Sequence, residues 1–165
     1  MSPESRRLLT GASSVATAAD RRVGDEAVRT EASAARRPRI IVADDHRAML
    51  DTLVRLLSAE FEVVAAVGDG EAAVAEVAQH HPDVVVLDIA MPRVDGIAAA
   101  AQLKARGSST KVVFVTNLHH REFVERALAL GDVGFVVKDR LVADLLPAIR
   151  GVLSGGTFVS PNVAR

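Results

Sequence analysis

Residues 84–92 read VVVLDIAMP. Three valines and a leucine form a short apolar run, typical of a strand that is buried on both faces, and the run stops at Asp88. An aspartate is almost never fully buried unless a partner compensates its charge. Asp88 is therefore expected where a strand leaves the core and a cationic group lies close by.

Four further β-branched runs surround this stretch. The five predicted strands are 39–43, 62–67, 83–88, 111–115 and 133–138. Segments of helical periodicity separate them, and this alternation is typical of a parallel sheet with helices on both faces. The sequence therefore predicts an α/β fold with a doubly wound, five-stranded parallel sheet.

Apolar spacing predicts one helix after each strand. The helices are expected to begin after His46, to span about 71–80, to begin after Gly96, to run near 120–130, and to include Leu145, Leu146, Ile149, Val152 and Leu153. Because proline is tolerated mainly in the first turn of a helix, Pro147 predicts that the last helix begins near 142–144. Asp144 is then a possible N-cap.

Length and composition limit the possible functions. The chain has 165 residues, of which 49% are hydrophobic, and this indicates one globular domain with a real core. A formal charge of −1 provides no broad field to attract nucleic acid or an anionic membrane. The absence of cysteine excludes disulfides and fits a cytoplasmic location. No apolar stretch approaches the roughly 18 residues of a membrane span.

The two ends of the chain differ from its centre. Residues 1–38 contain seven arginines, five acidic residues and no aromatic residue, so this extension is expected to be disordered or weakly helical. Its stretch 5–20 faintly resembles an export signal, but Gly11 and several hydroxyl residues interrupt it, which favours a solvated tail or an overextended start. Residues 155–165 are expected to be a tail or the start of a linker.

Polar side chains gather where the predicted strands end. Asp44 and Asp45 follow the first strand, Asp88 ends the third, Thr116 follows the fourth, and Lys138 ends the fifth. Ligands of open parallel sheets bind at the carboxyl ends of the strands, so these five side chains are expected to share one site. Three carboxylates in one place repel each other unless a cation joins them, and Mg²⁺ suits such oxygen ligands.

Four motifs then resemble one family. ADDH (43–46), LDIAMPRVDG (87–96), VFVTN (113–117) and GFVVKD (134–139) are similar in order and spacing to the response-regulator receiver domain over residues 39–154. The DDH form, FVERALALG (123–131) and GGTFVSP (155–161) resemble the NarL/FixJ subfamily. The resemblance implies a flavodoxin-like (βα)5 fold. Members usually continue into a LuxR-type helix-turn-helix, which is not expected within this chain.

The resemblance also implies a role for each site residue. Asp88 would be the phosphoacceptor, Asp45 a direct Mg²⁺ ligand, Asp44 a ligand through water, and the backbone carbonyl of Ala90 a further ligand. Thr116 would be the switch hydroxyl, Lys138 would pair with the phosphoryl group, and Phe135 occupies the position of the aromatic switch residue.

As a whole, the resemblance implies a cytoplasmic two-component response regulator that acts in transcription regulation. A sensor histidine kinase would supply the phosphoryl group to Asp88. The face made by the fourth helix, the fifth strand and the fifth helix would then change, and a homodimer could use that face or the first and fifth helices. The protein would catalyse only its own phosphorylation and dephosphorylation, so it is not expected to be an enzyme.

Other interpretations stay open. A receiver-like interaction module that works without phosphorylation is the main alternative, although such modules commonly lose one or more of the five site residues, and all five are present here. A phosphatase of the haloacid-dehalogenase type requires a second carboxylate two residues after the nucleophile, where this chain has Ala90. After Arg150 too little chain remains for a DNA-reading domain.

The histidines are assigned separately. His80 and His81 end a helix, where a positive imidazole suits the helix dipole, and this helix-end role is preferred. Adjacent residues do not share a helical face, so His119 and His120 are not expected to form a metal site. His46 could touch the acidic site or have a structural role in the first helical turn.

Overall fold

The computed structural model describes residues 36–118, 120–161 and 163. Apart from Arg36, these residues belong to one unit, Arg37–Arg165. The predictions made for residues 1–35, including the export-like stretch, lie outside the described residues, as does the prediction for His119.

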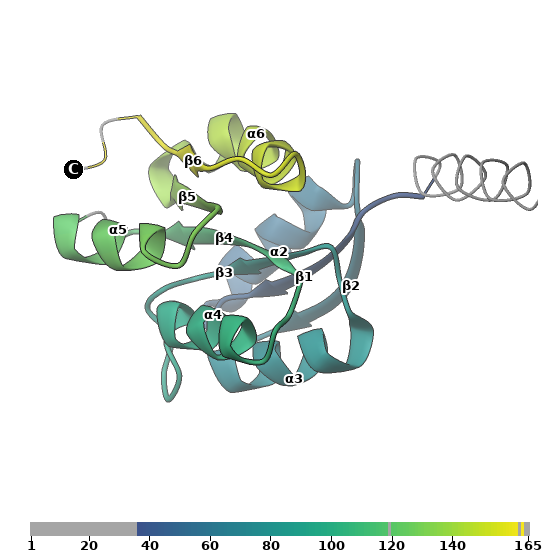
Figure 1. Ribbon diagram of the computed structural model, residues 1–165. Helices are drawn as coiled ribbons and strands as arrows, with labels where there is room; N and C mark the ends of the chain where they lie inside the picture. The colour runs from purple at the N-terminus through teal and green to yellow at the C-terminus, as the bar shows by residue number, and fades with distance from the viewer. Residues whose placement is uncertain (1–35, 119, 162, 164–165) are drawn as a thin grey trace, which may run out of the picture. The chain divides into compact units, whose positions relative to one another are not determined.

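Six parallel strands form the sheet, in the order β2-β1-β3-β4-β5-β6. The strands are β1 (Arg39–Ala43), β2 (Glu62–Val67), β3 (Val84–Leu87), β4 (Lys111–Thr116), β5 (Val133–Val137) and β6 (Phe158–Val159). The helices are α2 (Arg47–Leu57), α3 (Gly70–His80), α4 (Gly96–Ala105), α5 (Arg121–Leu128) and α6 (Leu141–Leu153), with a short 3₁₀ turn, η1 (Lys138–Arg140), before α6 (Figure 1).

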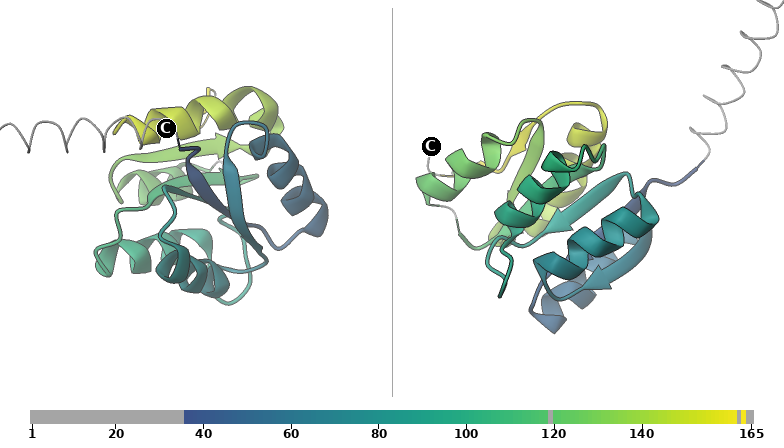
Figure 2. Two further views of the ribbon diagram at one scale, coloured as in Figure 1. Left: turned by 90° about the vertical axis from the view of Figure 1, so that its right-hand side faces the viewer. Right: turned by 60° about the horizontal axis from the view of Figure 1, so that its bottom comes forward.

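The helices cover both faces of the sheet because successive strand residues point to opposite sides. On β1, Ile41 and Ala43 pack toward α3, α4 and α5, whereas Ile40 and Val42 pack toward α2 and α6. Figure 2 shows these two helical layers from two further directions. Such double coverage explains why β3 is a continuous apolar run with every residue buried.

The predicted flavodoxin-like fold is confirmed, but the strand count needs a correction. All five predicted strands are present, and β6 adds a sixth within the segment expected to be a tail or linker. Two residues are too few to show a sequence period. Only the free edge of β5, which pairs Gly134 with Phe158 and Phe135 with Val159, makes this segment a strand.

The sequence predicted Pro147 in the first turn of the last helix, and this prediction is wrong. The helix α6 begins at Leu141, directly after η1, and Pro147 lies in its interior. A proline inside a helix costs about 3 kcal/mol, whereas burying one leucine or isoleucine contributes about 1.5–3 kcal/mol. Five apolar residues of α6 are buried, so packing outweighs the proline: Leu141, Leu145, Ala148, Ile149 and Val152.

Asp144 fastens the C-terminal strand instead of capping the helix. Its buried carboxylate accepts hydrogen bonds from Arg140 Nε (2.8 Å) and from the hydroxyl of Ser160 (2.7 Å). Ser160 in turn accepts the Val137 N–H (3.2 Å) and donates its own N–H to the Phe135 carbonyl (2.8 Å). Arg140 therefore holds the pKa of Asp144 below its usual value, and the ionised group anchors β6 beside β5.

Gly96 sets the path of the chain between β3 and α4. Its N–H donates to the Ile89 carbonyl (3.0 Å), and a Cβ at this position would overlap the backbone carbonyl of Asp88. The preceding Asp95 caps α4 by accepting the Ala98 N–H (2.7 Å). The loop that carries Asp88 therefore requires glycine here because two backbone segments touch.

We expect Gly96→Ala to lower the free energy of unfolding by about 2 kcal/mol or more, because a backbone carbonyl must move to admit the methyl group. Urea unfolding followed by far-UV circular dichroism measures this, since the chain has no Trp or Tyr. Gly68→Ala is the matched control. No atom lies within 4 Å of its added Cβ, so a change within about 0.5 kcal/mol is expected. Equal effects of the two substitutions would contradict the close approach.

Candidate functional site

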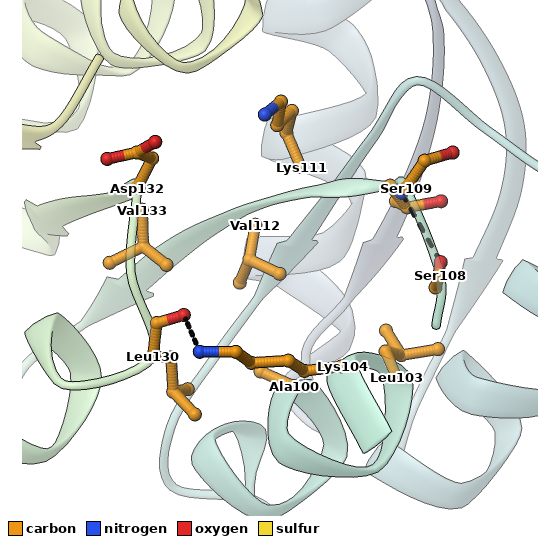
Figure 3. A pocket seen from close by; sticks show the side chains of 11 residues that line it. Ala100, Leu103, Lys104, Ser108, Ser109, Lys111, Val112, Leu130, Asp132 and Val133 are labelled. Atoms are coloured by element: carbon orange, nitrogen blue, oxygen red, sulfur yellow. Dashed lines mark hydrogen bonds between the residues drawn. The ribbon is translucent and has the colours of Figure 1, made fainter. Parts of the chain in front are cut away.

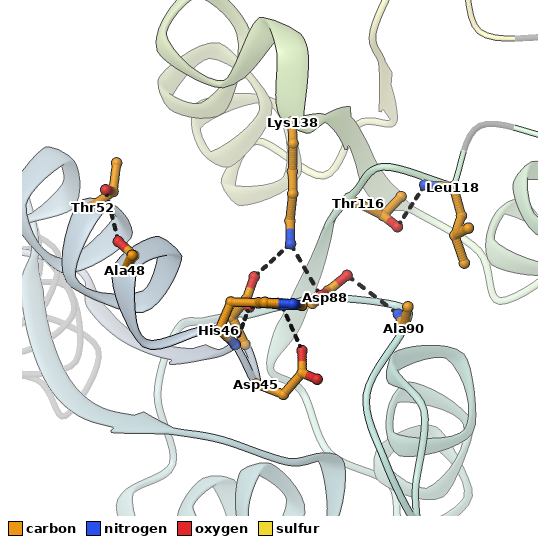
Figure 4. A network of polar contacts seen from close by, with 10 residues as sticks. Asp45, His46, Ala48, Thr52, Asp88, Ala90, Thr116, Leu118 and Lys138 are labelled. Atoms are coloured by element: carbon orange, nitrogen blue, oxygen red, sulfur yellow. Dashed lines mark hydrogen bonds and ion pairs between the residues drawn. The ribbon is translucent and has the colours of Figure 1, made fainter.

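Lys138 joins two buried carboxylates at the carboxyl ends of three strands. Asp44 directly follows β1, Asp88 follows β3 and Lys138 follows β5. The Lys138 ammonium donates to Asp44 Oδ2 (2.7 Å) and to Asp88 Oδ2 (3.1 Å). Asp44 and Asp88 are only 1% and 3% exposed. Figure 4 shows the lysine side chain reaching from its own strand toward Asp88.

The same edge carries Asp45 and His46. One ligand atom from each of Asp44, Asp45, His46 and Asp88 can be chosen so that all four lie within 4.8 Å of one another. The side chain of Asp45 is 30% exposed and lies next to the imidazole of His46 (Figure 4). The cluster is therefore buried on the Asp88 side and open on the Asp45 side.

Ala90 and Thr116 lie on the other flank of Asp88. The Ala90 N–H donates to Asp88 Oδ1 (3.2 Å), so both oxygens of this carboxylate have a partner. Thr116 ends β4, which pairs with β3, and its fully buried hydroxyl accepts the Leu118 N–H (3.0 Å). Figure 4 shows Thr116 at the end of its strand and Ala90 on the loop that follows Asp88.

Phe135 does not line the cluster. It lies within β5, opposite Phe114 of β4 and Val159 of β6, and it is fully buried in the core on the side of α5. Phe135 precedes Lys138 by three residues in the chain. Any influence of Phe135 on the site must therefore pass through the packing of β5.

Burial and charge oppose each other at Asp88. Removal from water raises the pKa of the Asp88 carboxyl above its usual value, the Asp44 charge adds to this, and the Lys138 ammonium only partly offsets it. For Lys138, burial lowers the pKa, but the hydrogen bonds and charges of Asp44 and Asp88 together outweigh it and raise the pKa. Lys138 therefore stays charged, and its one ammonium bonds two of the three carboxylates of the cluster.

Residues 40–150 match the response regulator receiver domain. The chain belongs to this family. It is 36% identical over 126 residues to the transcriptional regulatory protein PdtaR of Mycobacterium tuberculosis, covering 76% of this chain and 61% of PdtaR. It is 35% identical over 126 residues to DegU of Brevibacillus brevis, covering 75% of this chain and 53% of DegU. The chain thus spans only about half to three fifths of these two relatives.

Solved structures give the same result for the fold. The signal receiver domain of the putative response regulator NarL from Mycobacterium tuberculosis superimposes with a TM-score of 0.64 at 33% identity, covering 70% of this chain and 98% of that domain. The expected resemblance to NarL-like receivers is therefore supported by both sequence and structure.

The donor atoms of this receiver suit a hard divalent cation. Asp44, Asp45 and Asp88 offer carboxylate oxygens within one small volume, and the single ammonium beside them leaves negative charge uncompensated. Mg²⁺ binds through one or two carboxylates and keeps several waters, so the open side at Asp45 fits its requirements. The residues present are therefore compatible with the Mg²⁺ that the sequence predicted.

The sequence did not decide whether His46 contacts the acidic site or has a structural role in the first helical turn. The structure brings its Nδ1 atom to 3.0 Å from Asp45 Oδ1 and 3.4 Å from Asp44 Oδ1. In the sequence, only the position of His46 directly after Asp45 indicated this contact. By contrast, His80 pairs with Glu76 (3.0 Å) in the last turn of α3, and His81 follows that helix in a left-handed conformation.

A separate cavity lies at the opposite end of the strands, away from the acidic cluster. A cavity of about 280 Å³ opens where β4 and β5 begin, between Lys104, Lys111 and Asp132 (Figure 3). The Lys104 ammonium already donates to the Leu130 carbonyl (2.7 Å). This cavity shares no residue with the acidic cluster.

Within the described residues, no helix is both long and apolar enough to span a membrane.

We expect Lys138→Met to lower the free energy of unfolding by about 3 kcal/mol at pH 7 without divalent ions, since it leaves two buried carboxylates without their cation. Because burial raises the pKa of Asp88, protonation of this carboxyl removes the repulsion as the pH falls from 7 into the acidic range, and the loss should shrink. Urea unfolding at several pH values measures it.

Lys111→Met, at the amino end of β4, is the control for removing a lysine and should change stability by less than about 1 kcal/mol. Added Mg²⁺ should restore part of the loss in Lys138→Met. A loss that is independent of both pH and Mg²⁺ would mean that Lys138 acts through packing alone.

Proposed function

We propose that this receiver is a phosphoacceptor switch of a two-component system. A sensor histidine kinase supplies the phosphoryl group, Asp88 accepts it, and Mg²⁺ takes part. The observation that carries this proposal is the placement of Asp88: a buried carboxylate at the end of a central strand, 3.1 Å from the Lys138 ammonium and within an acidic cluster.

In the proposed reaction, an Asp88 carboxylate oxygen attacks the phosphorus of a phosphohistidine. The new O–P bond forms as the P–N bond breaks, and the histidine leaves with the electron pair. Lys138 is already charged and in place, so it can stabilise the oxygens of the transferring group without reorganisation. The Ala90 N–H orients the carboxylate from the opposite side.

The same residues would hold the cation. Asp45 would bind directly, Asp44 through water, and Asp88 together with the Ala90 carbonyl would complete the protein ligands. An Mg²⁺ ion held by these residues would offset the negative charge of the phosphoryl oxygens. The open, solvent-facing side at Asp45 leaves space for the water molecules that this ion retains.

The phosphoryl group adds about −1.5 to −2 charges at the cluster. We infer that the Thr116 hydroxyl exchanges its hydrogen bond with Leu118 for one to a phosphoryl oxygen, as Lys138 turns from Asp88 toward the new group. Both residues adjoin β5, so Phe135 repacks in response. Phe135 has no hydroxyl, and its contribution is therefore packing alone.

The output face in this proposal is formed by α5, β5 and α6. A homodimer could use this face or the face of α2 and α6. The edge of β5 is already paired with β6, so a partner on the first face must contact helix surfaces or displace that strand. Apart from its own phosphorylation and dephosphorylation, the protein is proposed to catalyse no reaction.

The proposal predicts that acetyl phosphate with Mg²⁺ adds the mass of one phosphoryl group to the wild-type chain. Intact-mass spectrometry measures it. Asp88→Asn should take up none, because its amide is not a nucleophile, whereas Asp83→Asn, which removes an aspartate before β3, should be labelled like wild type. Failure of the wild type to gain mass would favour the alternative, an interaction module that works without phosphorylation.

The phosphoaspartate is expected to decay slowly. The Ala90 N–H bonds Asp88 and the Leu118 N–H bonds Thr116, and neither residue has a polar side chain that could orient an attacking water. Mass spectrometry at intervals after removal of acetyl phosphate measures the lifetime. Ala90→Asn, which adds an amide, should shorten it; a wild-type lifetime of seconds would contradict this assignment.

A further inference from the structure

The acidic cluster has two sides that present different chemistry. On the inner side, the Lys138 ammonium contacts Asp44 Oδ2 and Asp88 Oδ2. On the outer side, Asp44 Oδ1 accepts the backbone N–H of His46 (2.8 Å), and the imidazole of His46 lies against Asp45 Oδ1. The side chain of His46 is 73% exposed, so it reaches the cluster from solvent and packing does not lock it.

The spacing of His46 Nδ1 and Asp45 Oδ1 matches that of neighbouring ligands on one ion. Two ligand atoms at adjacent corners of an octahedron with bonds of about 2.1 Å are about 3.0 Å apart. His46 Nδ1 and Asp45 Oδ1 are separated by 3.0 Å, and His46 Nδ1 and Asp44 Oδ1 by 3.4 Å. The imidazole nitrogen can therefore join the carboxylates around a cation without a change of backbone.

A nitrogen ligand changes which cation the site favours. Mg²⁺ prefers oxygen ligands, whereas imidazole suits the later first-row ions, which bind nitrogen more strongly. We propose that His46 is a ligand that shifts the preference of this site from Mg²⁺ toward divalent ions such as Co²⁺, Ni²⁺ and Zn²⁺. This inference rests on the proposed function, because it concerns the same cation site.

Isothermal titration of the full chain with Co²⁺ and, separately, with Mg²⁺ tests the proposal. His46→Gln keeps a polar side chain of similar size but removes the imidazole. We expect the ratio of Co²⁺ affinity to Mg²⁺ affinity to fall by about tenfold or more relative to wild type. The visible absorption of bound Co²⁺ should also change, because one nitrogen leaves its coordination shell.

His81→Asn is the matched control. It removes an exposed imidazole outside the cluster, and asparagine tolerates the left-handed conformation at that position. Its affinity ratio should equal that of wild type. Asp45→Asn should weaken binding of both ions, which locates them at the cluster.

The alternative is that His46 only donates a hydrogen bond to Asp45. It predicts that His46→Gln changes the affinities for both ions by the same factor, or changes neither, and that the Co²⁺ spectrum is unaltered. Either result would overturn the inference. Labelling of the wild type by acetyl phosphate with Mg²⁺ separates the two proposals: if labelling succeeds while the affinity ratio is insensitive to His46, only the inference about His46 fails.

Discussion

The ion pairs of Lys138 with Asp44 and Asp88 are the interaction on which the arrangement of the site depends. They join residues 94 and 50 positions apart in the sequence, each at the carboxyl end of a different parallel strand. All three side chains are nearly inaccessible to water, so their charges interact strongly and cannot be left unpaired. Lys138 nevertheless bonds only two of the three carboxylates of the cluster, and this shortage of positive charge makes the site suitable for a further cation.

The surrounding fold holds this electrostatic imbalance in place. Apolar layers on both faces of the sheet fix the strand ends, and the close contact of Gly96 with the Asp88 carbonyl fixes the loop that follows. Such a site costs stability, since burial raises the pKa of Asp88 and disfavours its charge. The apolar core compensates this cost, as is usual where function requires a strained group of charges.

The C-terminal strand β6 is linked by hydrogen bonds to the segment that carries Lys138. Ser160 bonds the backbone of Val137, the residue directly before Lys138, and it also bonds Asp144 on α6. Through these contacts, β6, β5 and the first turn of α6 form one polar connection next to the acidic cluster. Any movement of Lys138 therefore acts at the strand to which the C-terminal segment is attached.

The sequence by itself determined the layered α/β fold, the strand runs and the positions of Asp44, Asp88 and Lys138 at strand ends, because local apolar periodicity encodes these features. Only the tertiary structure decided the rest. The sixth strand exists because β5 has a free edge, and α6 continues through Pro147 because its buried face outweighs one lost hydrogen bond. Likewise, His46 meets Asp45 through the turn after β1, and such side-chain directions depend on three-dimensional contacts that no sequence period records.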